Sequence, residues 1–245
     1  PDAPASGREA AIPQRRGESR ARDALQALQR GLSACRRSGR LWWALADLFW
    51  AQGRYAEAER PLECALRYGE RSDFAAEASR RLAARYLMRG HHRSASRLGA
   101  EVWAEAIAEM AARRLSGEAF RLCYEAEHGG APDPLARLER ARVESPTSAV
   151  VLRALAARCL AAGRSADAAR AFTALCSLRP GDVDARSRCA AALVLAGDAA
   201  GAARLLARSP AQLPREAGWV LADAEAVAAG ELPRAAFAAR YQAGG

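Results

Sequence analysis

Six glycines recur along this chain at a nearly constant interval, and each separates two runs of helical apolar periodicity. They stand at Gly53, Gly90, Gly130, Gly163, Gly197 and Gly230. The intervals between them are 37, 40, 33, 34 and 33 residues. This length fits one helix–turn–helix unit per period, in which the glycine ends the first helix and releases the chain for the second. The period therefore predicts a chain built from repeated helical hairpins.

The apolar residues follow the same period. Before Gly53, an i, i+3, i+4, i+7 stripe is formed by Trp42, Leu45, Ala46 and Phe49. Small residues recur at matching places in three hairpins, where they would let paired helices approach closely: Ala46, Ala58, Ala156, Ala168, Ala190 and Ala202. Hydrophobic residues make up 51% of the chain and are mostly Ala and Leu, with few Val, which favours an all-α fold.

This pattern resembles the tetratricopeptide repeat (TPR) family. The match is strongest in residues 39–70 and strong in residues 149–182, where Pro180 closes the unit. It is recognisable in residues 183–214 and 216–240, and weaker in residues 80–102 and 117–146. The resemblance implies a right-handed α-solenoid of about five to six TPR-like repeats, with the first helix of each pair lining a concave groove. Extra residues between Gly90 and Gly130 are expected to lengthen a helix near residues 103–115.

Composition divides the chain into two parts. Residues 1–20 are rich in Pro, Ala and Arg and are expected to be a flexible linker or tail. Residues 21–241 are expected to form the TPR-like solenoid. No apolar run approaches the roughly 20 residues needed to cross a bilayer.

The chain has 37 basic residues, all of them Arg, against 28 acidic residues, which gives a net charge of +9. This positive charge favours acidic partners. The absence of Lys and Asn is best explained by a GC-rich genome. The Arg alternate with Glu and Asp at helical spacing, so most are expected on solvated faces. An Arg-rich helical repeat that binds nucleic acid, with bases stacked on a pair such as Trp43 and Arg40, stays open as an alternative.

The repeat register predicts which residues face the groove. Trp42 lies in the core stripe, whereas Trp43, Asp47 and Trp50 lie about a quarter-turn away. The same stripe in later repeats gives Arg80, Leu87, Phe120, Tyr124, Arg153, Leu160 and Val194. We therefore expect Trp43 and Trp50 to form an aromatic recognition surface. The alternative is that these two tryptophans pack against the preceding helix or beneath residues 1–20.

No catalytic, cofactor-binding or metal-binding pattern is present in the sequence. The adjacent His91 and His92 are expected in a solvated turn, because two neighbouring His cannot easily ligate one metal alone. Four cysteines at packing positions are expected to be buried free thiols: Cys123, Cys159, Cys176 and Cys189. Free thiols favour a reducing compartment, so we expect a cytoplasmic protein, with an anchor or signal upstream of Pro1 as the alternative.

The sequence thus predicts a non-catalytic scaffold or adaptor without cofactors, which binds a peptide or amphipathic helix of another protein in its groove. A tail clamp built from Lys and Asn is disfavoured, because both residues are absent. Three alternatives remain: nucleic-acid binding, a regulatory domain of a larger enzyme or assembly, and self-association.

Overall fold

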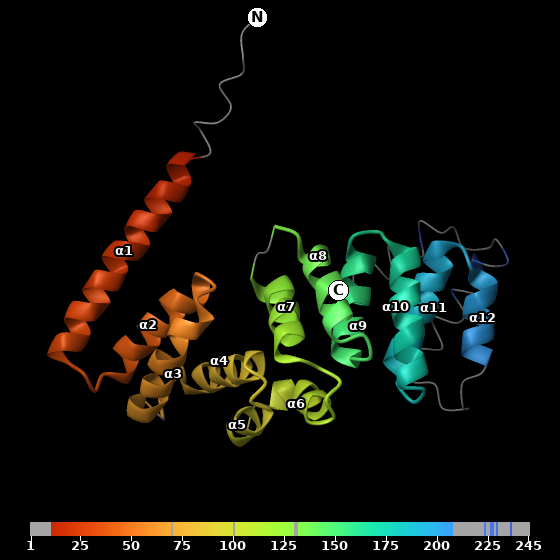
Figure 1. Cartoon of the computed structure of the whole chain (residues 1–245). Helices are drawn as coiled ribbons and strands as arrows, with labels where there is room; N and C mark the ends of the chain where they lie inside the picture. Colours follow the sequence, from red (N-terminus) through yellow and green to blue (C-terminus); the bar gives the residue numbers. More distant parts are fainter. Residues whose placement is uncertain are drawn as a thin grey trace, which may run out of the picture. The chain divides into compact units, whose positions relative to one another are not determined.

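The structure is a computed structural model that describes residues 11–69, 71–99, 101–129 and 132–207, together with residues 223, 226, 227, 229 and 236. In these residues it contains twelve α-helices, one short 3₁₀ helix and no strand, so the all-α helical-repeat fold is confirmed. Figure 1 follows the helices along the chain. Their bounds are α1 (Ala11–Ala34), α2 (Gly39–Ala51), α3 (Tyr55–Gly69), α4 (Ala75–Met88), α5 (His92–Arg97), η1 (Glu101–Trp103), α6 (Ala104–Ala111), α7 (Gly117–His128), α8 (Pro134–Glu144), α9 (Ala149–Ala161), α10 (Ser165–Leu178), α11 (Val183–Ala196) and α12 (Ala199–Ala207). Gly130, Gly230 and nearly all of the last predicted repeat, residues 216–240, lie outside the described residues.

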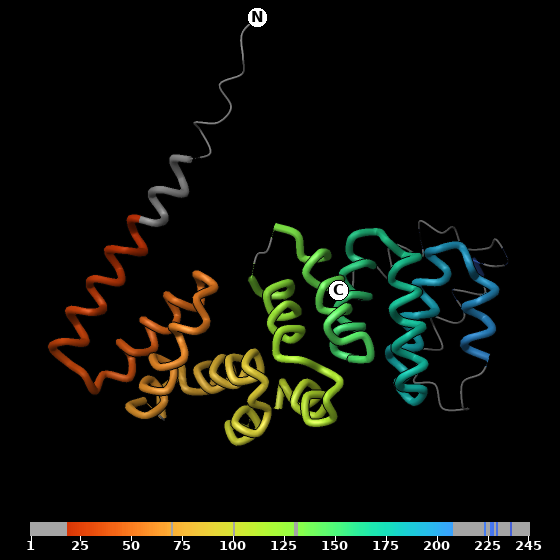
Figure 2. Tube along the Cα trace, in the orientation of Figure 1, coloured from red at the N-terminus to blue at the C-terminus, as the bar shows by residue number. Residues whose placement is uncertain are grey.

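The chain divides into two compact units. The first comprises residues 1–87 and 91–104, and the second comprises residues 88–90 and 105–245. In the first unit α2 packs on α1 and α3; in the second, α7 packs on α8, α9 on α8 and α10, and α11 on α10 and α12. Figure 2 traces these successive hairpins along the backbone. Each unit is therefore built from helices that pack on their neighbours in sequence.

The turns between paired helices use glycine as the period predicts. Gly53 and Gly163 have φ angles of 70° and 72°, a left-handed conformation that residues with a Cβ rarely adopt. Gly53 N–H donates to Trp50 O at 2.9 Å, and Gly163 N–H donates to Leu160 O at 2.9 Å. These bonds satisfy the last carbonyls of α2 and α9.

Helix starts are fixed by short polar side chains. In each of five helices, a Ser or Asp side chain just before the first turn accepts a hydrogen bond from the backbone N–H three residues later. These residues are Ser38 for α2, Ser116 for α7, Asp133 for α8, Ser148 for α9 and Asp182 for α11. The caps and the turn glycines together set the repeat length.

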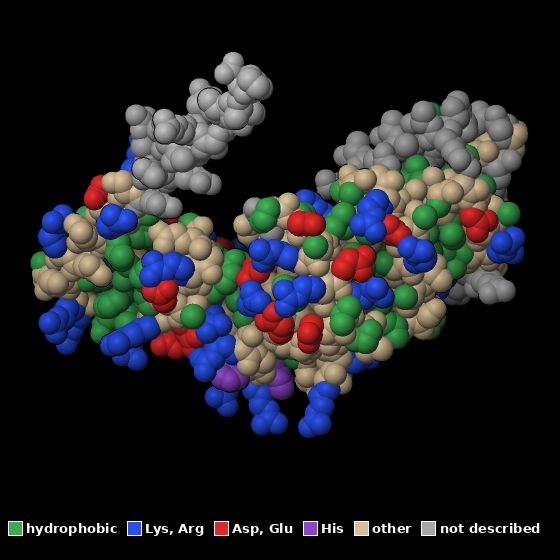
Figure 3. All heavy atoms as spheres, turned by 45° about the horizontal axis from the view of Figure 1, so that its top comes forward, with side chains coloured by type: hydrophobic (Ala, Val, Ile, Leu, Met, Phe, Trp, Pro, Cys, Tyr) green, Lys and Arg blue, Asp and Glu red, His purple; other side chains and the backbone are tan. Residues whose placement is uncertain are grey.

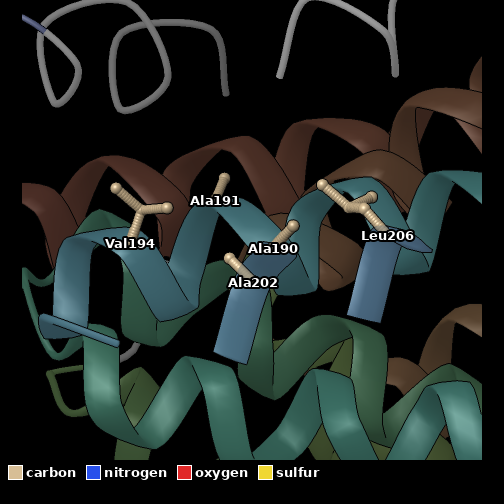
Figure 4. Packing of buried hydrophobic residues seen from close by; sticks show 5 residues of the cluster. All are labelled: Ala190, Ala191, Val194, Ala202 and Leu206. Atoms are coloured by element: carbon tan, nitrogen blue, oxygen red, sulfur yellow. The ribbon is translucent and has the colours of Figure 1, made fainter. Parts of the chain in front are cut away.

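The core forms where the paired helices meet, and small residues let them approach. All six alanines singled out by the repeat have no exposed surface: Ala46, Ala58, Ala156, Ala168, Ala190 and Ala202. Figure 4 shows Ala190 of α11 beside Ala202 of α12, within a cluster that also contains Val194 and Leu206. Larger side chains such as Phe172 and Leu62 are fully buried and fill the remaining space.

Two elements differ from the expectations. Helix α1 begins at Ala11, inside the segment expected to be a linker, while residues 1–10 lie outside the described residues. Ala, Gln and Arg favour a helix there, and Pro13 falls in the first turn, where its missing N–H costs little. The expected long helix over residues 103–115 is wrong: η1 and the eight-residue α6 occupy this region, and Arg113 follows α6 with a positive φ of 57°.

Candidate functional site

The tryptophans of α2 surround an arginine of α4. The Arg81 guanidinium lies 4.8 Å from the Trp43 ring centroid and 5.8 Å from that of Trp50. The Trp43 ring stacks on Phe74 at 5.7 Å between ring centroids with 5° between the planes, and Trp50 meets Tyr55 edge-on at 4.8 Å. Within the first unit these rings hold a cation of the protein itself through cation–π contacts.

Arg81 is also held by carboxylates. Its Nη1 lies 2.6 Å from Asp47 Oδ1, and its Nε lies 2.9 Å from Glu77 Oε1. Burial opposes the charge, but these hydrogen bonds prevail and raise the pKa of Arg81. The residue over Trp43 is therefore Arg81; the predicted partner Arg40 lies 3.6 Å from Asp73.

The expected roles of Trp42 and Trp50 are exchanged, whereas Trp43 has exposed surface as expected. Trp50, predicted to face the groove, is buried with 9% of its surface exposed, whereas Trp43 and Trp42 are partly exposed. The prediction that Trp42 is a core residue is wrong. Its indole N–H donates to Arg36 O at 2.8 Å, so the ring lies at the α1–α2 turn rather than inside the hairpin.

Several other residues of the predicted stripe are buried. Leu87 and Val194 have no exposed surface, and Phe120 and Tyr124 are 2% and 8% exposed. The two aromatic rings lie 6.3 Å apart, and Tyr124 stacks on His128 at 4.4 Å. In stacked repeats a neighbouring helix covers such positions, as the contact between α7 and α9 indicates. This leaves Trp43, Asp47, Arg80, Arg153 and Leu160 with exposed surface.

Most of the remaining charged residues of the stripe are paired. Arg80 Nη1 lies 2.6 Å from Glu77 Oε2. Arg153 forms ion pairs with Glu105 of α6 and, at 2.8 Å, with Asp182. Burial opposes the charge on Asp182, but the Ala185 N–H and Arg153 lower its pKa. The charge of this stripe is thus largely neutralised within the protein.

A buried carboxylate that sequence analysis missed lies in the second unit. Glu109 of α6 is 1% exposed and accepts hydrogen bonds from Ser148 Oγ, from Ala149 N at 2.9 Å and from Val150 N at 3.3 Å. Arg179 Nη2 donates to it at 2.9 Å. Glu109 therefore occupies the electropositive N-terminus of α9, which favours an anion. The available signal was one Glu inside the apolar run Ile107–Ala108–Glu109–Met110.

The cysteines are all free thiols. Cys123, Cys159 and Cys189 are buried as predicted, and burial raises the pKa of Cys123 to about 12. Cys176 is partly exposed, so the prediction that it is buried is wrong. Its pKa is raised by its interaction with Cys189 of the adjacent helix α11 and by burial. Cys176 lies on the edge of α10 rather than on its buried stripe.

No group of three potential metal ligands occurs among the described residues. His91 precedes α5 without a side-chain capping bond, and its neighbour His92 begins that helix. None of the described helices is long and apolar enough to span a membrane. Figure 3 shows acidic and basic side chains interspersed on the face it displays.

Part of the chain matches a known repeat family. Residues 159–224 match the family model described as tetratricopeptide repeat. Among solved structures, the chain is similar to YrrB, described as a TPR protein with an unusual peptide-binding site, at 15% identity and a TM-score of 0.36, covering 85% of this chain and 100% of that one. It is also similar to the TPR domain of P58(IPK), at 17% identity and a TM-score of 0.39, covering 90% of this chain and 67% of that one. No curated protein matches the sequence.

Proposed function

We propose that this chain is a tetratricopeptide repeat protein, since residues 159–224 match that family, and that it is a non-catalytic scaffold which holds a peptide or helix of another protein. The partner would lie against the first helices of the hairpins, α2 in the first unit and α9 in the second. Stacked hairpins bury their cores against one another and leave extended faces for binding, which supports a scaffold over a catalyst.

The observation that carries this proposal is exposed apolar surface on the first helices. Trp43 of α2 is partly exposed, and Leu160 of α9 is partly exposed beside the exposed Ala157, one turn apart. An amphipathic helix or extended peptide contributes apolar anchors to such positions. Aromatic residues that are half-buried before binding lose little conformational entropy when a partner covers them.

Because charged residues of these helices are already paired, the partner does not need charged groups to bind them. Arg153 and Asp47 already have partners within the protein. If Arg153 or Asp47 left its ion pair to bind a charged group of the partner, one ion pair would replace another, and the binding free energy would gain little. The affinity of the first-helix surface would then come mainly from apolar contacts and depend weakly on salt. Binding of nucleic acid through phosphates would instead weaken steeply as salt rises.

The test compares matched variants in affinity capture from cells of the source organism, followed by direct titration of the captured protein. Trp43→Ala and Leu160→Glu are expected to weaken binding. The controls are Phe49→Ala, an aromatic of α2 that contacts Arg54, and Leu178→Glu, an exposed leucine at the end of α10. Equal binding by test and control variants, or capture of nucleic acid alone, would contradict the proposal.

A further inference from the structure

A concave surface lies in the first unit, and its lining does not include Trp43 or Trp50. It is a depression of about 610 Å³ between α1, α2 and α3. Its lining comprises Gln29, Leu32, Ser33, Arg36, Trp42, Leu45, Arg60, Glu63, Cys64, Arg67 and Tyr68. Five of these residues come from α3, the second helix of its hairpin, so this surface differs from the first-helix faces described above. A volume of this size fits a few side chains of a ligand.

The charge around the depression is unbalanced. Arg36, Arg60 and Arg67 are all exposed, and none of them forms an ion pair with any described residue. Glu63 is the acidic residue among the described lining residues, and it accepts a hydrogen bond from the Tyr86 hydroxyl at 3.1 Å. Three arginines thus face an open surface with one carboxylate that already has a partner. Such a site attracts negative charge.

The floor of the depression is apolar. Leu32 and Leu45 are 8% and 7% exposed, so they form a nearly closed base. Trp42 and Tyr68 stand beside them with part of each ring accessible, and Tyr68 is 40% exposed. The hydrogen bond from the Trp42 indole to Arg36 O fixes this ring at the α1–α2 turn. The site therefore combines aliphatic and aromatic surface with unpaired guanidinium groups.

We infer that this depression binds a short acidic segment of a partner protein, which inserts an apolar side chain against Trp42 and Tyr68 and directs carboxylates to Arg36, Arg60 and Arg67. Guanidinium groups bind carboxylates in a planar, two-pronged geometry, and the leucine base accepts an aliphatic or aromatic anchor. The leucines favour a peptide over a nucleic acid, whose phosphates would use only the rim. This surface is independent of the proposed first-helix site.

The first experiment selects random peptides displayed on phage against the immobilised full chain. The selected peptides are expected to be enriched in Asp and Glu flanking Leu, Phe or Trp. A synthetic peptide of the enriched sequence is then titrated by fluorescence anisotropy. Arg60→Glu/Arg67→Glu should weaken its binding by about tenfold or more, because both rim charges are reversed. Arg22→Glu/Arg97→Glu makes the same change of net charge at exposed positions outside the lining and should leave the affinity unchanged.

The second experiment locates the peptide. Cys64 is partly exposed within the lining, and Cys35 is exposed outside it. The bound peptide should slow alkylation of Cys64, measured site by site by mass spectrometry, and leave Cys35 alkylation unchanged. Trp43→Ala/Leu160→Glu should retain the peptide, which separates this site from the first-helix site. Enrichment of peptides without acidic residues, no enrichment, equal binding by the two charge variants, or an unprotected Cys64 would each overturn the inference.

Discussion

Arginines are used in opposite ways at two sites, one in each unit. In the second unit, Arg153 and Arg179 reach the carboxylates of Glu105, Glu109 and Asp182 and tie α6 to α9, α10 and the start of α11. In the first unit, the depression between α1, α2 and α3 is bordered by arginines without a carboxylate partner among the described residues: Arg36, Arg60 and Arg67.

The difference shows that net charge does not locate a binding surface. The formal charge of +9 is a property of the whole chain, whereas a ligand responds to cations that the fold leaves unpaired. An ion pair with a buried carboxylate, such as Glu109 with the partly exposed Arg179, is costly to break, whereas replacing an exposed arginine that has no ion pair costs little stability. The same residue type should therefore have unequal effects on stability in the two regions.

The largest contrast is expected in thiol reactivity. Cys35 is exposed, whereas Cys159 and Cys189 have no exposed surface and Cys123 is 3% exposed. In the native state near pH 8, Cys35 should react rapidly, and the three buried thiols should react only through opening of the fold. Because burial raises the pKa of Cys123 to about 12, its thiolate is scarce as well. Timed alkylation followed by mass spectrometry measures each rate; fast native labelling of Cys159 would contradict the packing described for α9.

The next effect concerns Glu109. Glu109→Ala leaves Arg179, Ser148 and the first N–H groups of α9 without their buried acceptor, so the free energy of unfolding should fall by ~3–5 kcal/mol. Urea unfolding followed by circular dichroism measures the loss. Glu144→Ala, at an exposed position ending α8, should change stability by less than about 0.5 kcal/mol. A similar loss of unfolding free energy for both variants would contradict the expectation that the buried carboxylate stabilises the fold more than an exposed one.

A third test uses the tryptophans of the first unit. Trp50→Ala should lower the free energy of unfolding by about 3 kcal/mol, because a buried ring packed on Tyr55 is lost. Trp42→Ala should cost less, under about 2 kcal/mol, because that ring is partly exposed. Thermal melts of both variants decide the order. A larger loss for Trp42 would restore the assignment made from the repeat register.

A smaller effect is expected from Asp182→Asn. Asn can still cap α11, so near neutral pH the loss should be about 1 kcal/mol, from the ion pair with Arg153. The pKa of Asp182 is lowered in the folded chain, so its ionised carboxylate stabilises the fold above the unfolded pKa of about 3.9. This contribution is lost as the pH falls through the lower native pKa. Urea titrations near pH 7 and below about pH 3 should show the two proteins converging; a constant difference would assign the effect to something other than charge.

The smallest effect is expected at the depression itself. Arg60→Glu/Arg67→Glu should change the free energy of unfolding by less than about 0.5 kcal/mol, because neither arginine has an ion pair to lose. The same urea titration measures it, with wild type and Arg22→Glu/Arg97→Glu as references. A loss above about 2 kcal/mol would show that these arginines serve the fold rather than a ligand.

The fold could be predicted because its determinants are local. A glycine every 33 to 40 residues and alanines at fixed offsets each act within one hairpin. The burial of Ala46, Ala58 and Ala168 follows directly from that register. Local rules of this kind are readable in a single sequence.

The site was less predictable because exposure depends on contacts between elements. Trp42 and Trp50 have similar sequence surroundings, but Arg81 of α4 and Tyr55 of α3 cover Trp50, whereas α1 leaves Trp42 beside an open depression. The register assigned Leu87 and Val194 to an exposed surface, but both residues are fully buried. Glu109 contacts residues 39 to 70 positions away, and a local sequence pattern cannot predict partners at that separation.

The contacts of Glu109 with residues far along the chain limit where this array of helical hairpins can be divided. A hairpin array can usually lose or duplicate one hairpin, because each contacts only its neighbours. Here α6 caps α9 and binds the end of α10 across the intervening α7–α8 hairpin. A truncation between α6 and α7 would remove the acceptors of Arg179 and of the start of α9, and would leave Arg153 with Asp182 alone. The smallest segment that keeps all of these contacts therefore runs from α6 to Asp182, at the start of α11.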